Sequence, residues 1–169
     1  MNEFIIFANG PDKIGLVSSL SKKITDSGSN INESRMIKLG DHFAIILSIS
    51  TLLNQTEIKK ILSNQDLTFT IKNKFKKTNQ SSEFKVKKFL LKGADNEGLV
   101  YHLTNFFSEH RINIQNLNSN VTQAPVTGIN LFEIDGEIKI PKNISINFIE
   151  NQFLKIENKL SVDLKLIDI

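Results

Sequence analysis

The sequence predicts an α+β protein made of two ferredoxin-like sandwiches in tandem, each with the element order βαββαβ. The first observation is a repeat: residues 10–17, Gly-Pro-Asp-Lys-Ile-Gly-Leu-Val, recur 83 positions later as residues 93–100, Gly-Ala-Asp-Asn-Glu-Gly-Leu-Val. The second is that the same offset still relates the Asn-Ile pairs at 30–31 and 113–114. An offset that persists through a turn, a helix and the start of a strand indicates duplication of a whole module.

The first module begins with a strand and a helix. Residues 4–8 form a short apolar run, which favours a central strand covered on both faces. Asp12 is a candidate N-cap for a helix whose apolar residues recur at helical spacing, and Gly28 can end that helix in the left-handed conformation.

A hairpin, a second helix and a final strand complete this module. Strands are expected at 30–39 and 43–49, joined by a Gly-Asp turn. Asn54 and Glu57 have the spacing of a capping box at the start of the second helix. The closing strand alternates apolar residues, ending at Phe75, with lysines on its solvent face.

The second module repeats the order. A strand is expected at 84–91, a helix from Asp95 to about His110, and a hairpin of residues 113–122 and 126–134 around Pro125. Apolar residues mark a longer final helix and then a closing strand: Ile146, Ile149, Phe153, Ile156, Leu160, and Val162, Leu164, Leu166. The polar segment between the modules is typical of a linker. The predicted domains are therefore 1–75 and 84–169, with a linker at 76–83, and their mutual packing is left open.

Composition limits the class of protein. The chain of 169 residues has 40% hydrophobic and 23% charged residues and a net charge of +3, as in ordinary soluble globular proteins. No apolar run is long enough to span a bilayer, and the N-terminus lacks the features of a signal peptide. The absence of cysteine excludes disulfides, thiolate nucleophiles and the usual zinc motifs. We expect a cytoplasmic protein without a membrane partner.

No pattern in the sequence predicts catalysis or a cofactor. The three histidines lack the spacing of metal ligands on a helix, and no Ser-His-Asp order recurs in both modules. Gly10 and Gly15 have the spacing of the first two glycines of a P-loop, but Leu16 and Val17 stand where that motif requires Lys and Ser or Thr. We therefore expect no catalytic residue, no metal, no cofactor and no enzymatic activity.

The repeated turn is the candidate binding site. Glycines let a backbone approach a ligand closely, and the N–H groups at a helix start favour a carboxylate. Asp12 and Asp95 could accept an ammonium group, while Asn30 and Asn113 offer amide donors and acceptors. These parts suit a free α-amino acid. The alternative is that the aspartates are only N-caps and the asparagines only begin strands.

Two other functions remain open at this point. Lysines crowd the middle of the chain: Lys72, Lys74, Lys76, Lys77, Lys85, Lys87, Lys88, Lys92. A nucleic-acid-binding module of the same βαββαβ order is one alternative, but the basic-Gly-aromatic pattern of RNA-recognition motifs is absent. Lys72, Lys74 and Lys76 also alternate as the solvent face of a strand would. A purely structural dimerisation module is the other alternative.

The turn 10–17, the Asn-Ile pair at 30–31 and their copies resemble the ACT-domain family, whose modules bind amino acids and related metabolites. The tandem arrangement and residues 30–35 and 39–43 resemble the glycine cleavage system transcriptional repressor family. The resemblance implies two ACT-type sandwiches that sense glycine or a similar small amino acid. It further implies regulation through protein contact, with a transcriptional activator as partner and no direct nucleic-acid binding. A homo-oligomer is compatible with it.

In the ACT family the strand–helix turn of one module faces the second strand of its neighbour. Carried over to this sequence, the resemblance implies these ligand-binding residues: Asn9, Asp12, Gly15, Asn30, Ile31 in the first copy and Asp95, Gly98, Asn113, Ile114 in the second. The family usually has Pro before the second glycine, where this chain has Ile14 and Glu97. Because Glu97 adds negative charge beside a carboxylate site, the first site is expected to be the stronger.

Overall fold

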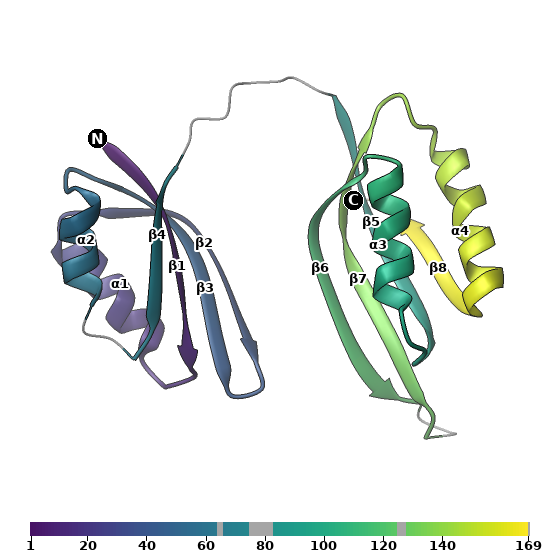
Figure 1. Cartoon of the computed structure of the whole chain (residues 1–169), viewed down its shortest axis with the longest axis horizontal. Coiled ribbons are helices and arrows are strands. Elements are labelled where there is room, and N and C mark those ends of the chain that lie inside the picture. The colour runs from purple at the N-terminus through teal and green to yellow at the C-terminus, as the bar shows by residue number, and fades with distance from the viewer. Residues whose placement is uncertain (64–65, 75–82, 125–127, 169) are drawn as a thin grey trace. The chain divides into compact units, whose positions relative to one another are not determined.

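The computed structural model describes residues 1–63, 66–74, 83–124 and 128–168, and the chain divides into two compact units, Met1–Thr78 and Asn79–Ile169 (Figure 1). Phe75, Pro125, Val126 and most of the predicted linker lie outside the described residues. The domain boundaries of the sequence analysis therefore stay predictions.

The first unit has the predicted element order. Its elements are β1 (Asn2–Pro11), α1 (Leu16–Asp26), β2 (Asn30–Leu39), β3 (His42–Thr51), α2 (Gln55–Leu62) and β4 (Thr68–Asn73). The strands form one antiparallel sheet in the order β2-β3-β1-β4, and both helices cover the same face of it (Figure 1).

The second unit repeats this topology. Its elements are β5 (Phe84–Ala94), α3 (Leu99–Glu109), β6 (Asn113–Gln123), β7 (Asn130–Pro141), α4 (Ile146–Leu160) and β8 (Val162–Ile167). The antiparallel order β6-β7-β5-β8 matches that of the first sheet strand for strand. The predicted fold class, two ferredoxin-like sandwiches in tandem, is confirmed.

Each unit has its own core between the sheet and its helices. In β1, Phe4, Ile6 and Ala8 are buried against the helices, whereas Ile5 and Phe7 on the opposite face are only half-buried. The expectation that this strand is covered on both faces was wrong for the unit itself. β1 is central in the sheet, but only one sheet face carries helices.

The first helix of each unit starts later than predicted. The N-caps are Gly15 and Gly98, at φ 88° and 82°, and neither helix has a side-chain cap. Asp12 and Asp95 therefore do not cap α1 and α3, and the expectation that these aspartates act as N-caps was wrong. A left-handed residue reverses the chain directly before the helix, so the preceding aspartates stay in the turn.

The other local signals were confirmed, with one strand misplaced. Gly28 ends α1 at φ 71°, and the Asn54–Glu57 capping box is complete. The predicted strand 126–134 was wrong in extent, because β7 runs on to Pro141 through Gly136. Asp-Gly is normally a turn signal. Here a Cβ would collide with the carbonyl oxygen of Asn116 on β6 and would approach the ring of Phe89 to 2.9 Å, so the sheet requires a glycine at this position.

Candidate functional site

The first glycine of each turn is required by the fold. A Cβ on Gly10 would lie 2.5 Å from the carbonyl oxygen of Asp66, and one on Gly93 would lie 2.5 Å from Cγ1 of Val162. Both contacts are with the chain that enters the last strand of the same unit. The close backbone approach expected for a ligand is therefore made, at these two positions, by the protein itself.

The second glycine shapes the start of the helix. Gly15 and Gly98 are left-handed N-caps, and no side chain caps α1 or α3. The N–H of Leu16, the first of α1, donates to the carbonyl oxygen of Lys13 at 3.3 Å, so only the N–H groups that follow it are open to a ligand. The positive end of the helix dipole lies at the same place. This arrangement can accept a small anion, provided that nearby side chains supply complementary charge.

Asp12 lies between the turn and the β2–β3 hairpin. Its backbone N–H donates to the carbonyl oxygen of Asp41 at 2.7 Å, and its carboxylate lies 2.6 Å from Nζ of Lys38. The Asp12 side chain is 31% exposed. Both signs of charge are thus present on this side of the turn, within reach of a small zwitterion.

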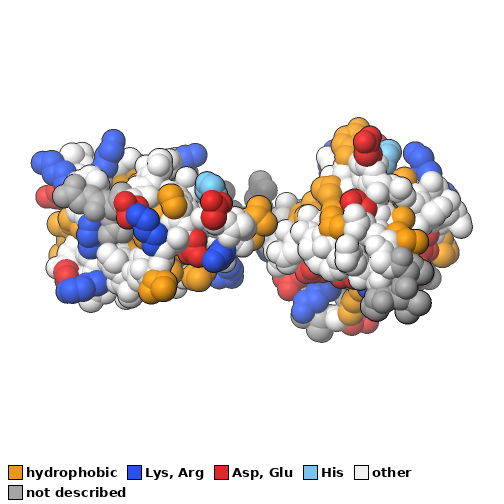
Figure 2. Space-filling view, turned by 90° about the horizontal axis from the view of Figure 1, so that it is seen from below, with side chains coloured by type: hydrophobic (Ala, Val, Ile, Leu, Met, Phe, Trp, Pro, Cys, Tyr) orange, Lys and Arg blue, Asp and Glu red, His pale blue; other side chains and the backbone are white. Residues whose placement is uncertain are grey.

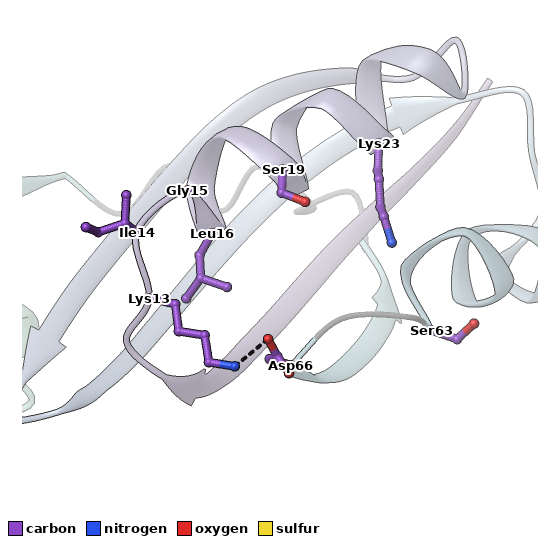
Figure 3. A pocket seen from close by; sticks show the side chains of 8 residues that line it. All are labelled: Lys13, Ile14, Gly15, Leu16, Ser19, Lys23, Ser63 and Asp66. Carbon is purple, nitrogen blue, oxygen red and sulfur yellow. Dashed lines mark hydrogen bonds and ion pairs between the residues drawn. The ribbon is translucent and has the colours of Figure 1, made fainter.

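A second ion pair lies on the other side of the turn. Nζ of Lys13 is 2.6 Å from Asp66, and the pair borders a cavity of about 580 Å³ that is also lined by Lys23, Ser19 and Ser63. Figure 3 shows Lys13 extending toward Asp66, Lys23 reaching from α1 toward the end of α2, and the exposed Ile14 turned away. A cavity of this volume is within the range of small-molecule sites.

The second turn lacks these charges. By sheet register and the sequence repeat, Asn96, Val121 and Ser161 occupy the positions of Lys13, Lys38 and Asp66. Glu97 adds an acid where the first turn has Ile14. Asp95 donates its backbone N–H to the carbonyl oxygen of Asn130 at 3.3 Å. The second turn keeps the backbone shape but has no counterpart of Lys13 or Lys38, and Lys92, at the position of Asn9, is paired with Glu133 at 2.5 Å.

Asn30 and Ile31 lie far from the turn of their own unit. Asn30 pairs with Ser50, whose other neighbour is Glu3 near the start of β1, whereas the turn follows the end of that strand. Seven residues separate Glu3 from Gly10 in an extended strand, which corresponds to about 23 Å. One unit cannot bring these two groups together on one small amino acid.

The Asn-Ile pairs have a structural role in both units. Ile31 and Ile114 pack against their cores, and the register of β2 and β6 shifts directly after them, as at a β-bulge. The amide of Asn30 donates to Oδ1 of Asn32 at 3.0 Å, and Asn113 is exposed at the equivalent position. The fold alone thus accounts for the isoleucines, while the exposed asparagine side chains stay available.

Sequence reasoning placed the remaining first-copy residue, Asn9, near the turn, and the structure has it exposed on the sheet face at the end of β1. Three charged partners were missed: Lys13, Lys38 and Asp66. Lys38 could have been found by extending the hairpin register, since it pairs with Phe43, the neighbour of Gly10. No local signal pointed to Asp66.

Several observations disfavour nucleic-acid and metal sites. RNA-recognition motifs stack bases on aromatic residues of the first and third strands, which here would be Phe4, Phe7 and Phe43. Phe4 and Phe43 are 3% and 4% exposed on the helix side of the sheet, and of the three Phe7 alone lies, half-buried, on the open face. On the face seen in Figure 2, basic and acidic side chains of the first unit are interspersed instead of forming one basic patch. Within the described ranges, no group of three His, Cys, Asp or Glu residues could hold a metal. No helix of the described residues is long and apolar enough to span a bilayer.

Comparison with known proteins agrees with this fold. The family model described as ACT domain matches residues 2–75. The chain is 28% identical to the glycine cleavage system transcriptional repressor of Escherichia coli (strain K12), over 71% of this chain and 65% of that protein, and equally to the Shigella flexneri protein of the same name. The chain thus spans 65% of the length of these curated relatives.

Two solved structures share the fold over nearly the whole chain. An unknown protein from Galdieria sulphuraria superposes with a TM-score of 0.86 at 22% identity, covering 99% of this chain and 98% of that one. A structure assigned as a glycine cleavage system transcriptional repressor gives a TM-score of 0.69 at 20% identity, covering 98% and 95%. Residues 2–75 therefore match the ACT-domain family, the second unit has the same fold, and the chain as a whole is similar to the glycine cleavage system transcriptional repressors.

Proposed function

We propose that this chain is a cytoplasmic, non-catalytic regulator that binds a small free amino acid, such as glycine, and signals to a protein partner, a transcriptional activator. The ACT match to residues 2–75 and the similarity to proteins named as transcriptional repressors support the regulatory role. The observation that carries the binding role is the turn of the first unit, where uncapped helix N–H groups lie beside the Asp12–Lys38 pair.

The chemistry of this turn matches a zwitterion. The ligand carboxylate would bind at the start of α1, beside Lys38, and the ammonium group would bind the carboxylate of Asp12. The Asp12–Lys38 pair already holds both charges in position. A bound zwitterion would replace this one ion pair by two, one between its carboxylate and Lys38 and one between its ammonium group and Asp12. The cations of the turn are missing from the second unit, so we assign binding to the first turn and a structural role to Asp95, Gly98, Asn113 and Ile114.

Asn30 and Ile31 enter the proposal only through pairing of two ACT units. Asn30 and Ile31 lie about 23 Å from the turn of their own unit. A ligand held by Asp12 and Gly15 can therefore contact these two residues only on the first unit of another copy of the chain. Binding would then stabilise one arrangement of paired units over another, and the partner protein would sense that difference as a coupling free energy.

The proposal is tested by a thermal-shift screen of the twenty amino acids on the full chain, followed by calorimetry on the hits. A ligand at ten times its Kd adds about 1.4 kcal/mol to the stability of the folded state. For a unit of this size that corresponds to a rise in Tm of about 5–10 °C. No shift with any amino acid at millimolar concentration would contradict the sensing role and favour a purely structural module.

Variants locate the site. Asp12→Ala and Asn30→Ala should each weaken binding of the hit amino acid, whereas the matched control Asp95→Ala should leave its Kd unchanged. Asp95 has the same position in the repeat, so the control removes the same group at the same place in the fold. Equal losses in Asp12→Ala and Asp95→Ala would contradict the assignment to the first unit.

A further inference from the structure

The two sheets differ on the face that their helices leave uncovered. We define the outer face of the first sheet by six apolar side chains that point away from α1 and α2: Ile5, Phe7, Ile37, Leu39, Ala44, Ile46. Leu39 is 77% exposed, Ile37 55% and Ile46 48%, and the other three are half-buried. The largest contiguous apolar patch on a protein is often functional, which makes this surface a candidate interaction site.

The second sheet shows that the fold does not require this surface. By register, Ile5, Ala44 and Ile46 correspond to Lys88, Glu133 and Asp135. On the edge strand, two more apolar residues of the outer face are replaced by Asn120 and Thr122. Phe7 corresponds to the half-buried Leu90, so five of the six apolar positions carry polar or charged residues in the second sheet. The fold therefore does not require an apolar surface at these positions.

The charges at the two edges of the outer face are self-complementary. Glu33, Ser48, Ile5 and Lys72 form one row across the sheet, with Glu33 on the edge strand β2 and Lys72 on the opposite edge strand β4. Rotation of a copy by 180° about an axis parallel to β1 places its β2 edge over the β4 edge of the first copy at the same height. Glu33, which lies 3.1 Å from Arg35 of its own chain in an exposed ion pair, then also faces Lys72 of the other copy, and the apolar centres meet.

We propose that the outer face of the first unit is a homodimer interface in which two copies of the chain pack sheet to sheet about such a two-fold axis. Sheets packed in this way keep their strands within about 30° of each other. A hollow of about 190 Å³ between Ile5, Ile46 and Arg35 offers space for an aliphatic side chain of the other copy.

The area predicts a weak dimer. Four strands about 4.8 Å apart and seven residues at about 3.3 Å give a patch of roughly 20 Å by 20 Å. About 400 Å² of projected area per copy is roughly half of the 800 Å² per partner of standard interfaces and falls in the class of weak, transient ones. We therefore expect dissociation on dilution into the micromolar range, on the order of the affinities of small interfaces. This proposal holds whether or not an amino acid binds at the turn.

Sedimentation velocity of the full chain over a range of concentrations tests it. The wild type should be a dimer that dissociates on dilution. Ile46→Asp, which introduces the residue that the second sheet carries at this position, should weaken the dimer by about tenfold or more without changing the circular dichroism spectrum. Leu154→Asp, an exposed leucine on α4 of the second unit, is the control and should leave the dimer intact.

Charge reversal tests the two-fold arrangement. Glu33→Lys and Lys72→Glu should each weaken the dimer by about fivefold, and the double variant should recover to within about twofold of the wild type. A wild type that is monomeric at every concentration, a dimer insensitive to Ile46→Asp, or a double variant weaker than either single one would overturn the proposal.

Discussion

Replacing Lys38 by the residue of the second unit, Lys38→Val, is the sharpest test of the proposed amino-acid site. The Lys38 ammonium is 2.6 Å from the Asp12 carboxylate. For a ligand carboxylate bound beside the same ammonium, we take a separation of about 4 Å between the two charges. Two charges at that distance attract by about 1 kcal/mol in water and about 4 kcal/mol at an effective dielectric constant of about 20. The Lys38 side chain is 62% exposed, so the lower figure applies.

A loss of about 1 kcal/mol weakens the affinity for the hit amino acid about fivefold, which isothermal titration calorimetry resolves easily. The loss should shrink in high salt, because the Debye length falls to about 3 Å at 1 M. Lys22→Ala is the matched control, since it removes a cation paired at 2.7 Å with Asp26, away from the turn. An unchanged Kd in Lys38→Val, or an equal loss in Lys22→Ala, would refute the reasoning.

Three further predictions concern the backbone and the charges around the turn. Gly10→Ala should destabilise the first unit by about 1–3 kcal/mol, because the added Cβ would overlap the carbonyl oxygen of Asp66. Urea unfolding followed by circular dichroism measures this loss, and a variant as stable as the wild type would contradict it. Arg111→Gly should stabilise the second unit by about 0.5–1 kcal/mol, since the arginine is left-handed at φ 55°; a lower Tm in calorimetry would argue against it. The hydrogen bond from His42 lowers the pKa of Asp41 below 3.8, so the contribution of this pair to stability is present above that pH and is lost as the pH falls through the lowered pKa. His42→Ala should raise the pKa of Asp41 in a carboxyl NMR titration, and an unmoved value would exclude the histidine as the cause.

The fold was largely predictable because its signals are local. The spacing of Asn54 and Glu57 predicts the capping box, the alternation in β8 predicts a strand, and Gly28 ends α1 where expected. The failures occur where packing overrides a local signal. Asp12 has the residue type of an N-cap, but the left-handed Gly15 starts the helix and Asp12 is held by the hairpin instead.

The candidate site was only half predictable, because its parts come from different elements. The turn lies within one short segment, so its glycines and Asp12 could be identified by the repeat. The partner of Asp12, Lys38, depends on the register between β2 and β3, and the partner of Lys13, Asp66, depends on how α2 connects to β4. Hydrophobic periodicity shows on which face of a strand or helix a residue lies, but not which residue of another element it contacts.

The sequence by itself determined the duplication, the order of the elements, the apolar faces that form the two cores and the position of the glycine turn, because these follow from local spacing. The tertiary structure alone decided which charges meet at that turn, that Asn30 lies at the far end of the sheet, and that one of two equivalent sheets presents an apolar outer face. Those features depend on strand register, which joins residues distant in sequence and has no local signature.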